Sequence, residues 1–224
     1  MNIEELNKLG VPDFAVDYFK GQKITSLNSA QVKAVNQGLL EGKNMLVCTP
    51  TGSGKTAIAT FAIARSLSKN EGSKALYLVP LRALASEKYR EYKALFKDSG
   101  FKVAISTGEL DSADEWFEKY DVLILTVEKM DSVLRHNASW VSLISTIIVD
   151  EVHLLNDVGR GPTLEILLTI LKQLLKNAQI IALSATIGNA KELAEWLNAQ
   201  LVIDDWRPVK LHKGVYLNGE VEFE

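Results

Sequence analysis

The chain has 224 residues, of which 28 are acidic and 25 are basic, and a formal net charge of -3. This charge excludes a strong overall basic field, so any contact with nucleic acid must come from a local face. Hydrophobic residues make up 47% of the chain, which is enough for a buried core and argues against disorder.

Helices are predicted at the N-terminus over residues 2–9, 13–19 and 29–40. From residue 44 onward, apolar runs of strand length alternate with segments in which apolar residues have helical spacing. The runs are continuously apolar, which is typical of parallel strands covered on both faces. The order predicts an α/β fold with a parallel sheet and helices on both faces. Predicted strands are 44–48, 75–79, 103–106, 122–125, 146–149 and 180–183, and predicted helices are 57–68, 83–96, 132–143, 163–175 and 190–197.

The composition changes after Ala199. The tail DDWRPVKLHKGVYLNGEVEFE has no helical pattern and is typical of exposed β-strand, and Pro208 marks a connector.

The single Cys48 excludes an internal disulfide and favours a reducing compartment. The acidic start MNIEELNKLG does not resemble a signal peptide, and no apolar run reaches about 18 residues. We therefore expect a cytoplasmic chain with no membrane span.

A glycine-rich turn, CTPTGSGKT, lies between the first predicted strand and the helix that follows it. Gly54, Lys55 and Thr56 match the end of the phosphate-binding loop pattern, while Thr49 replaces its first glycine. Such a loop aims backbone N–H groups at a phosphate chain; Lys55 would reach the β- and γ-phosphates of ATP and Thr56 would ligate Mg²⁺. An ordinary strand-to-helix turn is the alternative. The predicted loop comprises Thr49, Pro50, Thr51, Gly52, Ser53, Gly54, Lys55 and Thr56.

An acidic pair follows the predicted strand that ends at residue 149, in the order Asp150, Glu151, Val152, His153. Neighbouring carboxylates at a strand end repel each other unless a cation is present. Asp150 would hold Mg²⁺, and Glu151 would orient and deprotonate the attacking water. A solvated turn is the alternative for the pair, and a capping or packing role is the alternative to a coupling role for His153.

The order CTPTGSGKT, DEVH and Ser184-Ala185-Thr186 resembles the superfamily 2 helicases of the DExH-box type. Arg160-Gly161-Pro162 and Trp206-Arg207-Pro208-Val209 are most similar to the archaeal fork-unwinding DNA helicases, relatives of the helicase region of DNA polymerase theta. The resemblance covers residues 27–211. It implies a RecA-like domain in which Gln31 reads adenine and in which His153, Ser184, Thr186 and Arg160 couple the nucleotide to movement.

The same resemblance implies a face that grips the phosphates of one nucleic-acid strand. Pro80 to Ala85, Ser106 to Glu109 and Thr126 to Lys129 are similar to the motifs that form it. Hydroxyls and backbone N–H groups make such contacts without reading base sequence. Helix capping is the alternative role for the two threonines. The implied contact residues are Arg82, Thr107, Gly108, Thr126 and Lys129.

The resemblance implies three parts: a helical extension over 1–26, a first motor domain over 27–205, and a connector with the start of a second domain over 206–224. The arginine-rich motif that the family's second domain supplies does not occur in this sequence. The expected function is the ATP-binding motor domain of a DNA helicase, acting with ATP and Mg²⁺ on single-stranded or forked DNA in repair or replication-fork processing. A second RecA-like domain is the expected partner, and the fragment is expected to be a monomer. An RNA helicase domain and a binding-only fragment remain alternatives.

Overall fold

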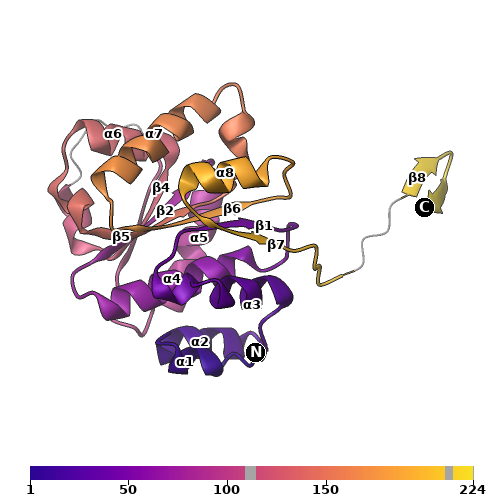
Figure 1. The fold of residues 1–224 in the computed structure, drawn as a ribbon, viewed down its shortest axis with the longest axis horizontal. Helices are drawn as coiled ribbons and strands as arrows, with labels where there is room; N and C mark the ends of the chain where they lie inside the picture. Colours follow the sequence, from indigo (N-terminus) through magenta and orange to yellow (C-terminus); the bar gives the residue numbers. More distant parts are fainter. Residues whose placement is uncertain (109–114, 210–213, 224) are drawn as a thin grey trace.

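A seven-stranded sheet runs through the middle of the protein in the computed structural model, which describes residues 1–108, 115–209 and 214–223. Its strand order is β3-β4-β2-β5-β6-β1-β7, and every neighbouring pair is parallel (Figure 1). The predicted α/β fold with a parallel sheet is therefore confirmed. The strands are β1 Met45–Cys48, β2 Lys74–Val79, β3 Val103–Ser106, β4 Val122–Thr126, β5 Ile144–Val149, β6 Gln179–Ser184 and β7 Gln200–Ile203.

Alternate residues of each strand enter two separate apolar cores, one on each face of the sheet. In β1, Met45 and Val47 join one core, whereas Leu46 and Cys48 join the other. Both sets are buried because helices cover both faces, and this explains why the strands read as unbroken apolar runs. The first face carries α1 Glu5–Lys8, α2 Asp13–Gly21, α3 Ser29–Asn36, α4 Lys55–Lys69 and α5 Arg82–Leu95; the second carries α6 Val127–Arg135, α7 Gly161–Leu174 and α8 Ala190–Leu197.

The N-terminal helices α1 and α2 share the core of the first face. Ile3, Leu6 and Phe19 are buried there, and the Phe19 ring lies 5.2 Å from the ring of Phe61 in α4. An ion pair between Lys20 and Glu4 (2.7 Å) joins the two helices at the surface. Residues 1–26 thus pack against the sheet layer through the same apolar cluster as α4.

Two predicted helices differ clearly from the structure. The helix predicted over 132–143 is wrong: α6 begins after Thr126, and Asn137, with φ 52°, separates it from a short 3-10 helix, Ser139–Leu143. The helix predicted over 29–40 ends at Asn36, since Gly38 has φ 100°, and a 3-10 turn, Leu39–Glu41, follows. Positive φ breaks a right-handed helix. The other 3-10 helices are Glu115–Lys119 and Val152–Asn156.

The sequence-based analysis also missed β7, which lies at the edge of the sheet and pairs with β1. Only Val202 of this strand is fully buried, so the strand lacks the continuous apolar run of the others. After β7 the chain leaves the sheet, and the expected exposed strand structure is present as a hairpin, β8 Gly214–Leu217 and β9 Glu220–Phe223, whose residues are all exposed. No helix in the described ranges has both the length and the apolar character needed to cross a membrane.

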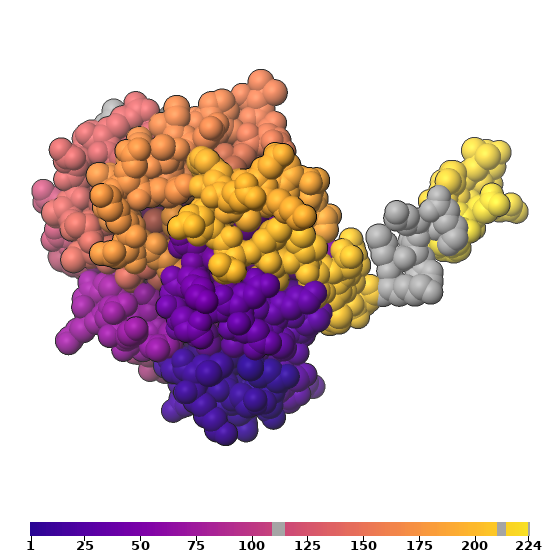
Figure 2. All heavy atoms as spheres, viewed as in Figure 1, coloured from indigo at the N-terminus to yellow at the C-terminus, as the bar shows by residue number. Residues whose placement is uncertain are grey.

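The start of the connector lies against the N-terminal half of the domain. The space-filling view shows the orange-yellow atoms that follow β7 beside the violet atoms of the first third of the chain (Figure 2). Lys33 in α3 makes an ion pair with Asp204 at 2.8 Å, which joins these two segments.

Candidate functional site

Six loops leave the carboxyl ends of neighbouring strands along one edge of the sheet. The glycine-rich turn follows β1, the DEVH segment follows β5 and Ser184 ends β6, and these three strands are adjacent. The segments after β2, β3 and β4 form the other half of the same edge. In open α/β sheets, ligands bind in the crevice beyond these strand ends. The edge is therefore divided into a half with phosphate-binding chemistry and a half with the predicted nucleic-acid contacts.

The glycine-rich turn has the backbone conformation that a phosphate-binding loop requires. Gly52 and Gly54 have φ of 79° and 80°, in the left-handed region that other residues rarely adopt. A Cβ at Gly54 would also lie 2.7 Å from Nε2 of Gln31, so a side chain at this position would have to displace the Gln31 amide. Within the loop, Thr49, Pro50 and Ser53 are buried, Thr51 and Gly52 are exposed, and Gly54, Lys55 and Thr56 are half-buried.

Lys55, the first residue of α4, folds its side chain back into the loop. Its Nζ donates hydrogen bonds to the carbonyl oxygens of Thr49 (2.9 Å) and Pro50 (3.3 Å). Burial lowers the Lys55 pKa from its ordinary value, while the negative charges of Glu151 and Asp150 oppose that shift. The ammonium is thus held within the loop and within the electrostatic reach of the acidic pair. It can exchange two neutral carbonyl partners for charged phosphate oxygens, which form stronger hydrogen bonds.

Gln31 joins helix α3 to the loop. Its backbone N–H and side-chain oxygen form a capping box with Asn28, and its Nε2 donates to the Gly54 carbonyl at 3.3 Å. Asn28 adds a second link, from Nδ2 to the Ser53 carbonyl at 2.8 Å. A glutamine amide has two N–H donors and two acceptor lone pairs. One donor and one acceptor of Gln31 therefore remain for a ligand, which is the pair that an adenine edge requires.

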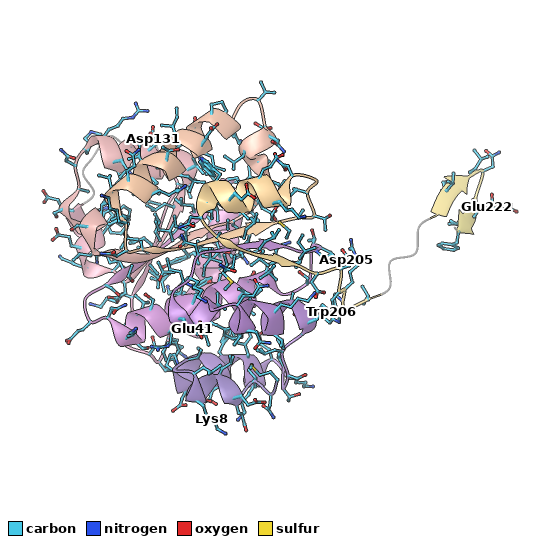
Figure 3. The ribbon with its side chains drawn as sticks, in the orientation of Figure 1. Lys8, Glu41, Asp131, Asp205, Trp206 and Glu222 are labelled. Carbon is cyan, nitrogen blue, oxygen red and sulfur yellow. The ribbon has the colours of Figure 1, made fainter. Side chains whose placement is uncertain are left out.

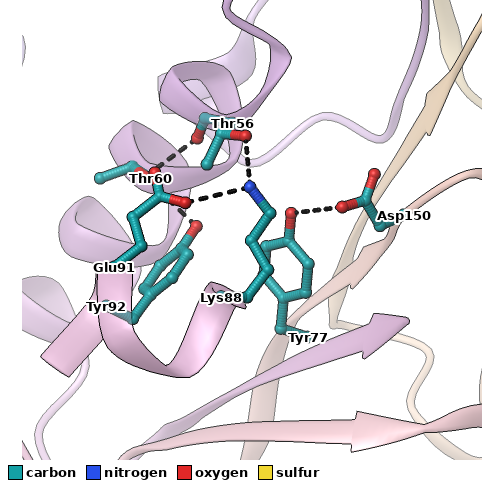
Figure 4. A network of polar contacts seen from close by, with 7 residues as sticks. All are labelled: Thr56, Thr60, Tyr77, Lys88, Glu91, Tyr92 and Asp150. Atoms are coloured by element: carbon teal, nitrogen blue, oxygen red, sulfur yellow. Dashed lines mark hydrogen bonds and ion pairs between the residues drawn. The ribbon is translucent and has the colours of Figure 1, made fainter. Parts of the chain in front are cut away.

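Asp150 is held from two sides. Its Oδ2 accepts a hydrogen bond from the buried Tyr77 hydroxyl at 2.9 Å (Figure 4). Its Oδ1 accepts a hydrogen bond from the Glu151 backbone N–H at 3.0 Å. Glu151 has φ 52°, a conformation that costs energy for a residue with a side chain and that recurs at functional sites. His153 Nδ1 lies 3.3 Å from Glu151 Oε2 but is poorly aligned for a hydrogen bond.

Thr56 faces a cation in the structure. Its hydroxyl accepts a hydrogen bond from Nζ of the buried Lys88 at 2.8 Å, and Lys88 also pairs with Glu91 at 3.0 Å (Figure 4). The hydroxyl oxygen is therefore oriented toward a position that accepts positive charge. Thr56 and Asp150 are hard oxygen donors of the kind that Mg²⁺ prefers. Two such ligands fit a metal that takes its remaining ligands from phosphates and water.

A hollow of about 710 Å³ lies beside the glycine-rich turn. Its wall includes Gln31, Gly52 and Gly54, together with the segment from Lys23 to Ser29 and Trp206 from the connector. This volume lies within the range of small-molecule sites. The hollow is thus large enough for a nucleoside next to the loop that would hold its phosphates.

A second hollow, of about 460 Å³, lies at the other half of the sheet edge. All five predicted nucleic-acid contacts line it, and Arg160, predicted as a coupling residue, joins them there. Thr126 is the N-cap of α6: its hydroxyl accepts from the Lys129 backbone N–H at 3.3 Å, as the capping alternative predicted. Arg82 and Arg160 are exposed, Thr107 and Gly108 are half-buried, and Thr126 and Lys129 are buried; Glu109 lies outside the described residues.

The residues predicted to couple the site to movement lie in different surroundings. Ser184 is fully buried, and its hydroxyl makes no hydrogen bond to Asp150 or His153. Thr186, two residues further, is exposed. Cys48 lies next to this segment, and burial raises the pKa of its thiol to about 11, so it is a neutral packing residue at physiological pH.

Three residues that contact the candidate site were not predicted from the sequence: Asn28, Tyr77 and Lys88. Asn28 has a recognisable signal, because an asparagine followed three residues later by glutamine is typical of a capping box. Tyr77 and Lys88 have none. Tyr77 is one member of an apolar strand, and Lys88 is one of several cations on a charged helix.

The comparisons with known proteins agree with this arrangement. The family model of the DEAD/DEAH box helicases matches residues 28–193. The chain is 51% identical over 224 residues to the ATP-dependent DNA helicase Hel308 of Pyrococcus abyssi, and 50% identical over 216 residues to that of Methanocaldococcus jannaschii. It covers 30% and 18% of the length of these two relatives, respectively.

Two solved structures share the fold. A crystal structure of the DUF1998 helicase MrfA bound to DNA matches 88% of this chain and 30% of its own, with a TM-score of 0.76 and 24% identity. A second MrfA structure, bound to DNA and AMPPNP, matches 88% of this chain and 29% of its own, with a TM-score of 0.75 and 25% identity. The resemblance predicted from the motifs is confirmed, and the chain belongs to the DEAD/DEAH box helicase family.

Proposed function

We propose that this chain is the ATP-binding motor domain of an ATP-dependent DNA helicase. The observation that carries the proposal is the convergence of Lys55, Thr56 and the acidic pair at the ends of the adjacent strands β1, β6 and β5. Relatives about 50% identical over the whole chain are named ATP-dependent DNA helicases, and the chain spans about a third of their length or less. The unwinding activity of a longer protein is part of this proposal.

Each residue of the nucleotide half has a distinct proposed role. Lys55 binds the β- and γ-phosphates in exchange for its two loop carbonyls. Thr56 and Asp150 hold Mg²⁺, which when bound neutralises charge on the phosphates. Glu151 orients the attacking water and accepts its proton. Gln31 pairs with the adenine edge through its remaining donor and acceptor.

The nucleic-acid half is proposed to bind the backbone of single-stranded or forked DNA. Arg82 and Arg160 are the two exposed cations of its hollow, and Thr107 and Gly108 can add a hydroxyl and a backbone N–H. Phosphate contacts of this kind account for DNA binding by a chain of net charge -3. We further infer a role in DNA repair or fork processing, a cytoplasmic location, and a second RecA-like domain as the partner that completes the ATP site.

Nucleotide binding is tested with Lys55→Ala in calorimetry. The loss of a charge-assisted phosphate contact should weaken ATP binding by roughly tenfold to a hundredfold. Lys69→Ala is the matched control, because Lys69 is an exposed lysine at the other end of the same helix. Equal ATP affinity in the Lys55 and Lys69 variants would refute the phosphate-binding role.

The division of roles in the acidic pair is tested with two amide substitutions. Glu151→Gln should retain Mg²⁺-ATP binding and should lose hydrolysis in a protein of the length of the relatives, because an amide cannot accept the proton of water. Asp150→Asn should weaken Mg²⁺ binding itself, because the metal loses a full negative charge. Normal Mg²⁺-ATP binding by both variants would contradict this assignment.

DNA binding is tested by the salt dependence of affinity. Arg82→Ala should weaken single-stranded DNA binding and lower the slope of log affinity against log salt by about one unit. Arg90→Ala, an exposed arginine further along the same helix, is the control. Greater stimulation of ATP hydrolysis by RNA than by DNA would favour the RNA helicase alternative.

The last test compares residues 1–224 with a protein of the length of the relatives. We expect the chain alone to hydrolyse ATP slowly and to respond little to DNA, because an arginine finger contributes about 10³–10⁵ in rate in P-loop GTPases and none is supplied here by a second domain. Equal DNA-stimulated turnover by both proteins would contradict a two-domain mechanism.

A further inference from the structure

Trp206 is a large aromatic residue in an unusual position. It follows the edge strand β7 and lies at the margin of the domain (Figure 3), where 40% of its surface is exposed to solvent. It lines the same 710 Å³ hollow as Gln31 and the two loop glycines. Fully buried tryptophans such as Trp140 (1% exposed) are explained by core packing. Trp116 is as exposed as Trp206, at 43%, but it does not line this hollow, so the position of Trp206 rather than its exposure distinguishes it.

Asp204 holds the connector in place. Asp204 is only 8% exposed to solvent. Its Oδ1 accepts hydrogen bonds from the Trp206 backbone N–H and from the Ser29 hydroxyl, both at 2.8 Å. Its Oδ2 pairs with Lys33 Nζ at 2.8 Å, and the same ammonium donates to the Ile203 carbonyl at 3.0 Å. The backbone at Trp206 is therefore fastened to helix α3 by a nearly buried carboxylate.

Helix α3 also carries the residues that contact the glycine-rich loop. Asn28 and Gln31 bond to the carbonyls of Ser53 and Gly54, whereas Ser29 and Lys33 bond to Asp204. One short helix thus sets the position of Trp206 relative to the loop. A nucleotide whose phosphates enter the loop would have its base within the hollow between Gln31 and the connector.

We propose that Trp206 is the residue on which the nucleotide base stacks, and that Asp204 is its positioning residue. This inference rests on the proposed ATP-binding function. An indole offers a broad π face, and stacking on an aromatic side chain tolerates any base because every base has such a face. Gln31 would then discriminate adenine by its edge, while Trp206 would supply affinity that depends on the presence of a base.

Binding measurements with and without a base test this division of labour. Calorimetry should compare ATP, GTP and inorganic tripolyphosphate for the wild-type chain and for Trp206→Ala. We expect the variant to bind ATP and GTP about tenfold more weakly and tripolyphosphate equally well. Trp206→Phe should retain most of the ATP affinity, because it keeps an aromatic face. Gln31→Ala should instead reduce the preference for ATP over GTP.

Two further variants separate stacking from a general structural effect. Asp204→Ala should lower ATP affinity without changing tripolyphosphate binding, because it releases the connector and leaves the loop intact. Trp116→Ala is the control, since Trp116 is 43% exposed and lies in the 3-10 helix Glu115–Lys119, outside the lining of the 710 Å³ hollow. ATP should also change the intrinsic tryptophan fluorescence of the wild type, and this change should disappear in Trp206→Ala and persist in Trp116→Ala.

The outcomes distinguish the two levels of the proposal. A wild-type chain that binds neither ATP nor tripolyphosphate would refute the proposed function and this inference with it. A wild type that binds ATP with the same affinity as Trp206→Ala would refute only the stacking role. Equal losses for ATP and tripolyphosphate in Trp206→Ala would also refute it, because the tryptophan would then act on the loop rather than on the base.

Discussion

Tyr77→Phe isolates the hydrogen bond that holds the proposed Mg²⁺ ligand Asp150. Tyr77 is fully buried, and its hydroxyl donates to Asp150 Oδ2 at 2.9 Å. Phenylalanine fills the same space as the tyrosine ring, so the substitution removes the hydrogen bond and leaves only the volume of one hydroxyl unfilled. Hydrogen bonds to charged groups contribute about 1.5–3 kcal/mol. Because Asp150 is half-buried and water can replace one partner, we expect a loss near the lower end, about 1.5 kcal/mol.

Tyr92→Phe is the matched control. The ring of Tyr92 lies 5.4 Å from that of Tyr77 in the same core, and its hydroxyl accepts a hydrogen bond from Thr60 at 3.2 Å. Both variants lose one buried phenol, and both should be less stable. Only Tyr77→Phe frees Asp150, so only this variant should need more Mg²⁺ to bind ATP.

The assays are thermal unfolding and ATP titration over a range of Mg²⁺ concentrations. A loss of about 1.5 kcal/mol should lower the melting temperature by roughly 3–6 °C in a chain of this size. If Tyr77→Phe and Tyr92→Phe show the same Mg²⁺ dependence, the Tyr77 hydroxyl does not position the metal ligand, and the reasoning from this contact is wrong.

The same two tyrosines predict how stability depends on alkaline pH. Burial raises the pKa of both Tyr77 and Tyr92 well above the ordinary value near 10. Above about pH 10 the unfolded chain releases these protons while the folded chain retains them. Titration of these two groups therefore leaves the free energy of unfolding independent of pH below about pH 10. Above about pH 10 it lowers the free energy of unfolding by about 1.4 kcal/mol per pH unit for each tyrosine. Either phenylalanine variant should show a smaller decline between pH 10 and the point at which the protein unfolds.

Two further substitutions test contacts around the DEVH segment and the proposed Mg²⁺ site. Gly161→Ala places a Cβ 2.2 Å from the Leu155 carbonyl oxygen, so α7 must shift, and we expect thermal unfolding to show a loss of stability of about 1–3 kcal/mol. Gly188→Ala is the control, because a Cβ there meets nothing within 4 Å. Equal melting temperatures for the two variants would contradict the close contact at Gly161. Lys88→Met removes the ammonium that donates a hydrogen bond to the Thr56 hydroxyl at 2.8 Å and that would compete with Mg²⁺ for this oxygen. In ATP titrations, the variant should therefore require a lower Mg²⁺ concentration than the wild type. An unchanged Mg²⁺ requirement would show that Lys88 does not compete with the metal.

Local sequence patterns determined the elements whose side chains are buried on both faces or that carry a loop of special backbone geometry. Six strands of the central sheet were predicted to within two residues at each end, and burial on both faces explains the continuous apolar runs of the inner ones. The glycine-rich loop was predictable because two glycines, both with positive φ, lie between a strand and a helix. The edge strand β7 was missed; only one of its residues is fully buried, but the same is true of the other edge strand, β3, which was predicted, so burial alone does not separate the two cases.

Contacts between distant segments depended on the tertiary structure alone. Nothing local in the sequence indicates that Tyr77 reaches Asp150, or that Lys88 reaches Thr56, since each pair is separated by many residues and meets only when the strands and helices pack. The same holds for Trp206, a connector residue that the fold brings to the hollow beside the glycine-rich loop. Periodicity reports which side chains are buried along one element, whereas the order of the strands decides which strand ends become neighbours. For this reason the sequence predicted which residue types lie at the candidate site, and the packing of the sheet and helices decided which other side chains contact them.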